Sequence, residues 1–259
     1  MTLVWRPGFQ FDADASTYNE AVEAADTQAL ETGVRYAIND FVIGCKQDGI
    51  WSAIKASCIL AGARTLAGAL TPLAGTAPNR FGTEGGWNYN RKTGLQGNGT
   101  DNYLNSNRNN NADPQNSIHL ACFVSSSFGN SRFMIASADN TSVTNLYKGS
   151  TGNAASYLRG GTIISSAAAI TTGFFGSSRT SGTSINGRYS GVSVFNNSST
   201  SVSPSAEALE IFRSSTYPSL YLGDGRLAFY SIGESLDLAK LDTRVSALIT
   251  AFQAPGVIP

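Results

Sequence analysis

The sequence predicts a mainly β protein: an antiparallel β-sandwich preceded by helices and followed by an amphipathic helix. Charged residues make up only 14% of the 259 residues, against about 25% in an ordinary globular domain, and Gly, Ser, Thr and Asn take their place. Apolar residues recur at every second position in parts of residues 87–233, as at Ile118, Leu120 and Val124, which is the period of a half-buried strand. Turn pairs that contain Gly lie between such segments, as in sandwiches and barrels.

Residues 1–14 are predicted to be an N-terminal assembly arm. Trp5, Phe9 and Phe11 make the arm aromatic, while Pro7 and Gly8 prevent a regular element. The three aromatic side chains either fold back on their own domain or dock on a neighbouring subunit. Because so short an arm has little core of its own, we favour docking on a neighbour.

Residues 15–86 are predicted to be a helical segment followed by an irregular connection. Residues 15–31 are rich in Ala and Glu, which favours a first helix. A second helix follows, with an apolar stripe from Val34 to Cys45 at helical spacing. Residues 50–55 are expected to form a short helical turn, and the rest of the segment is rich in Gly, Thr and Pro.

Residues 87–233 are predicted to form the sandwich. Turn pairs inside this range include Asn186–Gly187 and Asp224–Gly225. The second pair lies between two short apolar segments, residues 220–222 and 227–229. This arrangement predicts a β-hairpin at that point.

Residues 234–259 are predicted to be a C-terminal helix and tail packed on the sandwich. Leu241, Val245 and Leu248 repeat at helical spacing and form an apolar stripe. Asp237 precedes the stripe, where a carboxylate favours the positive end of the helix dipole.

The composition argues against several classes of function. The formal net charge is zero, with 18 basic and 18 acidic residues, so no nucleic-acid partner is expected. The N-terminus has no apolar signal segment, and the longest apolar stretch, residues 59–70, is too short to span a bilayer, so no membrane insertion is expected. The three cysteines form no metal-binding or disulfide pattern, and no metal or cofactor is expected.

Two stretches of the sequence are distinctive. Residues 38–56 contain KQDGIWSAIKA, and residues 225–236 read GRLAFYSIGESL and precede an amphipathic helix. Between them, residues 94–104 read GLQGNGTDNYL. In this order, the three segments resemble structural proteins of tailed-bacteriophage virions that carry a concanavalin A-like lectin/glucanase (LamG-like) domain. The resemblance covers most of residues 34–253 and implies a jelly-roll sandwich in a virion component, while the fold alone does not settle the function.

No catalytic residue is predicted. Sandwich glucanases need paired carboxylates within roughly 5–10 Å of each other. Glu207 and Glu210 have a spacing that places them on opposite faces of a strand, so two solvated surface carboxylates are expected. His119 is the only histidine and is expected to be a structural residue of a strand. The segment 109–113 contains one carboxylate, Asp113, as a charged ligand for calcium. Calcium sites in proteins combine several oxygen ligands, including carboxylates, so no metal site is predicted.

Glycan binding is the site hypothesis that the sequence supports. Binding sites combine aromatic side chains with a few neutral polar groups, and sugar rings stack on exposed aromatic rings. Phe128, Tyr147 and Tyr157 lie in segments rich in Gly, Ser and Asn and are the candidate glycan-binding residues. The alternative for each is a place in the hydrophobic core.

These observations predict a non-enzymatic surface protein of a phage virion. The preferred function is a tail-fibre or baseplate appendage that binds host surface polysaccharide. The alternative is a head decoration or cement protein with a structural role, and the least favoured is a polysaccharide-degrading enzyme. Expected partners are other virion proteins, contacted through the N-terminal arm, and further copies of the chain in a homo-oligomer. The expected location is the virion, assembled in the host cytoplasm.

Overall fold

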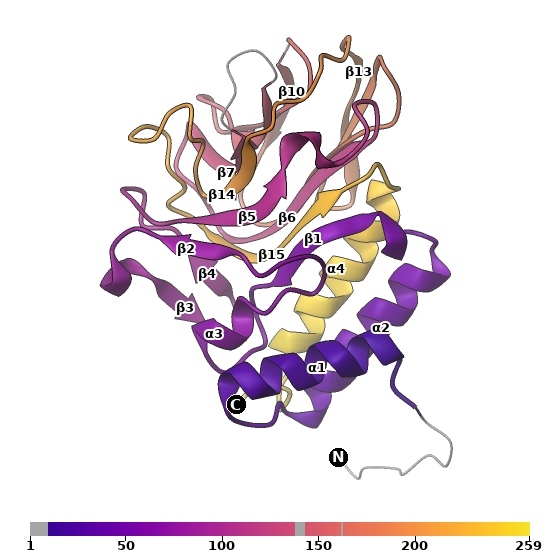
Figure 1. Cartoon of the computed structure of the whole chain (residues 1–259), viewed down its shortest axis with the longest axis vertical. Coiled ribbons are helices and arrows are strands. Elements are labelled where there is room, and N and C mark those ends of the chain that lie inside the picture. The colour runs from indigo at the N-terminus through magenta and orange to yellow at the C-terminus, as the bar shows by residue number, and fades with distance from the viewer. Residues whose placement is uncertain (1–9, 138–142, 162) are drawn as a thin grey trace.

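Figure 1 shows the computed structural model of the chain, which describes residues 10–137, 143–161 and 163–259. The molecule has three layers: helices, a β-sheet that the helices cover on one face, and a second sheet packed on the other face. We call the sheet in the middle the inner sheet and the sheet far from the helices the outer sheet. The predicted fold class, a mainly β antiparallel sandwich with helices at both ends, is confirmed.

The inner sheet contains the central strands of the molecule. Its strands are β1 (Ile54–Ile59), β3 (Asn88–Asn90), β4 (Gly94–Gln96), β6 (Ile118–Ser126), β11 (Gly173–Arg179), β12 (Ser184–Tyr189), β13 (Val192–Ser198) and β15 (Arg226–Gly233). They pair in the order β13-β12-β11-β6-β15-β4-β3, and β1 also pairs with β15. All of these pairings are antiparallel.

The outer sheet carries the face that is most distant from the helices. Its strands are β2 (Asn79–Phe81), β5 (Tyr103–Asn109), β7 (Arg132–Ser137), β8 (Thr144–Lys148), β9 (Asn153–Leu158), β10 (Ile164–Ala169) and β14 (Ala208–Ile211). They pair antiparallel in the order β10-β9-β8-β7-β14-β5-β2.

Two hydrophobic cores lie on opposite faces of the inner sheet. In β6, Leu120 and Cys122 belong to the core between the sheets, whereas Ala121 belongs to the core under the helices. In β15, Phe229 faces the helices and Tyr230 faces the outer sheet. This division follows from the pleat of a strand, in which successive side chains point to opposite faces. It explains why these strands are apolar at nearly every position.

The helical layer consists of α1 (Ala13–Asp26), α2 (Thr32–Gln47) and α4 (Leu238–Gln253), and the short helix α3 (Leu66–Ala69) packs against α1. α2 packs against α4, and Arg244 of α4 pairs with Asp48 after α2, with Nε 2.7 Å from Oδ2. Asp12 and Asp237 cap α1 and α4 by accepting backbone N–H bonds. Short 3₁₀ turns cover Trp51–Ala53, Glu84–Gly86 and Asn110–Ala112. Within the described ranges, no helix has the length and hydropathy to cross a bilayer.

The sandwich begins earlier than the predicted residue 87. Residues 54 and 55 belong to β1 and not to a helical turn, because antiparallel pairing with β15 outweighs the local helical signal. Strand β2, at residues 79–81, also precedes the predicted boundary and forms one edge of the outer sheet. The predicted connection therefore contributes a strand to each sheet.

Two predicted turns are wrong. Asp224–Gly225 closes no hairpin, because residues 212–225 form a loop that carries the chain from β14 in the outer sheet to β15 in the inner sheet. Asn186–Gly187 lies inside β12, and the turn falls at Ser190 and Gly191, which both have positive φ. Both pairs have the composition of a tight turn, but the register of the sheet decides where the chain reverses.

Candidate functional site

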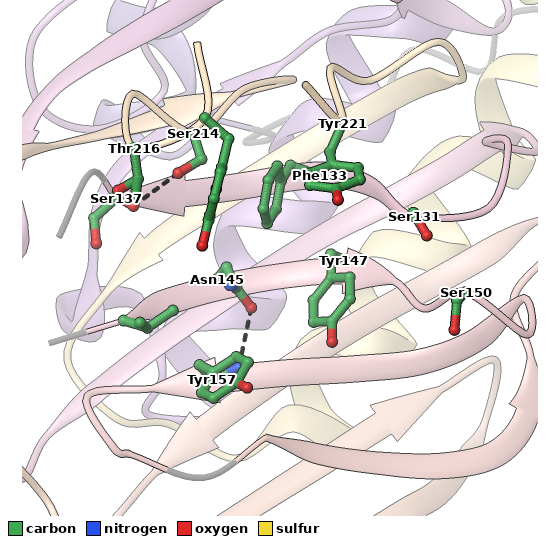
Figure 2. A pocket seen from close by; sticks show the side chains of 12 residues that line it. Ser131, Phe133, Ser137, Asn145, Tyr147, Ser150, Tyr157, Ser214, Thr216 and Tyr221 are labelled. Carbon is green, nitrogen blue, oxygen red and sulfur yellow. Dashed lines mark hydrogen bonds between the residues drawn. The ribbon is translucent and has the colours of Figure 1, made fainter. Parts of the chain in front are cut away.

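A pocket opens on the outer sheet between strands β7, β8 and β9 and the 212–225 loop (Figure 2). Its volume is about 310 Å³, at the lower end of the range for small-molecule sites. Apart from one valine, the lining residues are aromatic or small and polar: Ser131, Phe133, Ser137, Val143, Asn145, Tyr147, Ser150, Tyr157, Ser214, Thr216, Tyr217 and Tyr221.

The alternation of β8 and β9 brings polar and aromatic side chains to this face. Leu146 and Leu158 belong to the core between the sheets. Their neighbours Asn145, Tyr147 and Tyr157 therefore point to the opposite face, where they line the pocket. Asn145 Oδ1 accepts a hydrogen bond of 3.1 Å from the backbone N–H of Tyr157 (Figure 2). This bond holds the Asn145 amide beside the tyrosine rings.

Phe133 of β7 is the centre of an aromatic wall. Its ring centroid lies 5.9 Å from that of Tyr147, 6.3 Å from that of Tyr217 and 6.1 Å from that of Tyr221. Phe133 is buried, whereas Tyr217 and Tyr221 each expose 43% of their surface. The buried ring therefore supports exposed rings on which a ligand can stack.

Backbone hydrogen bonds hold the 212–225 loop against the sheet. The Phe133 N–H of β7 donates to the carbonyl oxygen of Tyr221 at 2.9 Å, and the Phe212 N–H donates to that of Met134 in β7 at 2.9 Å. Phe212 and Tyr221 have φ values of +71° and +61°. This left-handed conformation costs a residue other than glycine about 1–3 kcal/mol, and such positions are concentrated at active sites and ligand clamps.

Two hydroxyl groups of the lining have no hydrogen-bond partner among the described residues. They are the buried Oγ of Ser137 and the buried Oγ1 of Thr216. Close by, the Ser214 hydroxyl donates to the carbonyl oxygen of Ser137 at 3.2 Å (Figure 2). A buried polar group without a partner costs about 1–3 kcal/mol. A ligand that supplies hydroxyl groups would remove this cost.

The described lining of the pocket carries no charged side chain. Burial raises the pKa of Tyr147 to about 12, so this phenol stays neutral and can donate a hydrogen bond at physiological pH. Lys148 is next in the chain but turns away, and its Nζ donates to Ser127 Oγ and to the carbonyl oxygen of Phe128. The pocket therefore suits a neutral, hydroxyl-rich ligand with apolar faces.

The structure brings two of the three predicted glycan-binding residues together. Tyr147 and Tyr157 line the pocket. Phe128 does not, which corrects the prediction: it is only 2% exposed and stacks on Phe212 with centroids 6.2 Å apart. A ring buried in this way offers a sugar no face.

The predicted assembly arm is described only in part. Trp5 and Phe9 lie outside the described residues. The ring of Phe11 lies 5.2 Å from that of Tyr36 and 5.3 Å from the guanidinium carbon of Arg35, both in α2. Phe11 therefore contacts α2 of its own chain, and its docking on a neighbouring subunit stays a prediction.

Three aromatic residues of the pocket were not predicted: Phe133, Tyr217 and Tyr221. Tyr217 is followed by Pro218, and the segment 214–220 is rich in Ser and Thr, a composition typical of an exposed loop. This signal could have identified Tyr217. The assignment of residues 220–222 to a strand concealed Tyr221, and nothing in the sequence links Phe133 to this loop.

The remaining candidates are structural in the described part of the chain. Glu210 is 6% exposed, contrary to the expectation of a solvated carboxylate, and burial raises its pKa. Its Oε2 lies 3.5 Å from Nε of Arg213. His119 is buried as expected of a structural residue, and Asp113 forms an ion pair with Arg108. The described residues contain no group of three or more potential metal ligands.

No family model and no curated protein matches the sequence. Solved structures do resemble the fold. Domain 4 of AbnA, a GH43 extracellular arabinanase from Geobacillus stearothermophilus solved with arabinotriose, matches with a TM-score of 0.50 and 12% identity over 74% of this chain and 97% of that one. The binding domain of botulinum neurotoxin serotype D matches with a TM-score of 0.52 and 10% identity over 79% of this chain and 52% of that one, so this chain spans about half of its length. At such identities the likeness shows a common β-sandwich fold.

Proposed function

We propose that this chain binds a neutral glycan in the pocket of the outer sheet, without catalysis, as a surface component of a phage particle. One observation carries the glycan proposal. The exposed rings of Tyr217 and Tyr221 stand beside neutral polar groups, in a described lining that has no charge. Sugars present apolar ring faces edged with hydroxyl groups, and this lining offers a surface complementary to both. The AbnA domain, solved with arabinotriose, indicates that a domain of this architecture is compatible with a bound glycan.

The phage proposal rests on the resemblance of residues 38–56 and 225–236 to virion proteins. These stretches contribute to α2, β1 and β15, and β1 pairs directly with β15. They belong to the inner sheet and the helical layer, on the side of the molecule away from the pocket (Figure 1). If this side attaches to the particle, the outer sheet faces the host, as a tail appendage requires. A head decoration protein remains the alternative.

A glycoside hydrolase is the less favoured alternative. Its chemistry needs two carboxyl groups at the scissile bond, and the described lining of the pocket has none. Glu210 is buried against Arg213 instead. Release of reducing sugar from a bound polysaccharide, lost in a Glu210→Gln variant, would establish this alternative.

Titration calorimetry with neutral oligosaccharides tests the glycan proposal. We expect Tyr147→Ala and Tyr157→Ala each to weaken binding about tenfold, equivalent to about 1.4 kcal/mol, because each removes a ring from the pocket. Tyr36→Ala, which removes an exposed tyrosine of α2 outside the pocket, is the matched control and should bind normally. Equal affinity of all three variants and the wild-type chain would refute the proposed site.

Antibody labelling of intact particles, viewed by electron microscopy, tests the phage proposal. Label on the tail supports the receptor-binding role, and label on the head supports the decoration role. Purified particles that carry none of this chain would refute both.

A further inference from the structure

A second aromatic surface lies on the outer sheet beyond the pocket. The rings of Phe81 in β2 and Tyr103 in β5 are nearly parallel, with an interplanar angle of 7° and centroids 4.8 Å apart. The guanidinium carbon of Arg213 lies 4.0 Å from the centroid of the Tyr103 ring. We call Phe81, Tyr103 and Arg213 the β2 platform.

The β2 platform and the pocket share one face of one sheet. Leu104 belongs to the core between the sheets, so Tyr103 beside it points outward. Phe81 is the register partner of Tyr103 and points the same way. Asn145 and Tyr147 of β8 point to this outer face as well, because Leu146 between them belongs to the core. Strands β7, β14, β5 and β2 lie side by side in this order, so β14 separates the pocket strand β7 from the platform strands β5 and β2 (Figure 1).

The β2 platform repeats the chemistry of the pocket. Phe81 exposes 42% of its surface although it is a large apolar residue, and its stack on Tyr103 holds the ring in one orientation. Asn79 and Asn105, register partners in β2 and β5, add neutral amides to the same face. The charge of Arg213 is balanced by Glu210, 3.5 Å away. The surface therefore offers a ring and amides without net charge.

We propose that the β2 platform is a second subsite for the glycan bound in the pocket, so that the ligand is a chain of neutral sugars that spans both. This inference rests on the proposed function of the pocket. Four strand steps separate β8 from β2, roughly 19 Å at about 4.8 Å a step. A disaccharide reaches one subsite only, whereas a longer chain reaches both, and linking two weak contacts raises the overall affinity.

The test compares the disaccharide and the hexasaccharide of the neutral series that binds the wild-type chain in calorimetry. We expect the hexasaccharide to bind the wild-type chain at least tenfold more tightly. Phe81→Ala should reduce its affinity to about that of the disaccharide and leave disaccharide binding unchanged. Phe81→Tyr, which keeps a ring, should retain the hexasaccharide affinity and controls for damage to the edge strand. Tyr147→Ala should weaken both ligands.

The outcomes separate the two proposals. If Phe81→Ala leaves hexasaccharide binding unchanged while Tyr147→Ala weakens it, the second subsite is refuted and the pocket stands. Equal affinity of the wild-type chain for the two ligands also refutes the second subsite. If no neutral oligosaccharide binds, or if Tyr147→Ala has no effect on either ligand, both proposals fail.

Discussion

His119 is fully buried in β6, and both of its ring nitrogens have partners. Nδ1 lies 2.6 Å from the carbonyl oxygen of Glu234, and Nε2 lies 2.8 Å from Oγ of Ser231. A carbonyl oxygen only accepts, so Nδ1 carries the proton and Nε2 accepts from the serine. Burial lowers the pKa of His119 from 6.5 to about 4, because a charged imidazolium would lose its hydration there.

This shift makes folding depend on pH. Between pH 6.5 and about 4 the unfolded chain binds a proton that the folded chain does not bind, so the free energy of unfolding decreases as the pH falls through this window. We expect the wild-type chain to lose about 2 kcal/mol from this group between pH 7 and pH 5, measured by urea unfolding. Because the chain has one histidine, His119→Gln should flatten the profile over this range. An unchanged slope in the variant would contradict the assignment.

At the scale of the element, the start of α4 depends on Asp237. Its Oδ1 accepts from the N–H groups of Ala239 at 2.8 Å and Lys240 at 3.3 Å, and both would otherwise lack a partner in the first turn. We expect Asp237→Ala to lower the free energy of unfolding by about 1 kcal/mol, measured by urea unfolding. Asp237→Asn keeps a capping oxygen and should lose only a fraction of this. Equal loss in both variants would indicate that charge, not capping, matters.

Elements with a long periodic pattern were predictable. The stripe of Leu241, Val245 and Leu248 identifies α4, because apolar residues three or four positions apart lie on one face of a helix. The alternation of apolar residues in β6 identifies a strand, because every second side chain of a strand lies on the same face. Residues 54–59 were misassigned in part, since their strand state depends on β15, far away in the sequence. Local sequence carries little information on such distant pairing.

The pocket was predictable only in part for a related reason. Tyr147 and Tyr157 were found because both lie in polar surroundings, and the same argument selected Phe128, which is buried. The sequence context of an aromatic residue does not reveal which face of a strand it occupies. The aromatic wall also joins β7 to a loop about 80 residues later, as Phe133 and Tyr217 illustrate, and this proximity exists only in the folded chain.

At the scale of the whole molecule, the inner sheet belongs to both hydrophobic cores. Phe229 packs under the helices and Tyr230 packs between the sheets, although they are adjacent in β15. Helices and outer sheet therefore touch the same strands from opposite sides. Loss of either core exposes one face of the inner sheet, so we expect all three layers to unfold together.

Two tryptophans can report on the two cores separately. Trp51 packs against the core under the helices, and Trp87 packs against the core between the sheets. In variants that keep only one of these two tryptophans, with Trp5 also replaced by Phe, we expect the same urea midpoint from either fluorophore. Phe229→Ala should lower the free energy of unfolding by about 3–5 kcal/mol and move both midpoints equally, although Phe229 touches one core only.

Val192→Ala is the control for this experiment, because Val192 is 58% exposed and its truncation should change stability by no more than about 0.5 kcal/mol. The decisive comparison is between the two fluorophores in the Phe229→Ala background. A midpoint that moves for Trp51 and stays in place for Trp87 would mean that the helical layer unfolds first and leaves a stable sandwich. Equal movement would mean that the shared sheet couples the layers, so that a pocket on the outer face depends on packing under the helices on the opposite side of the molecule.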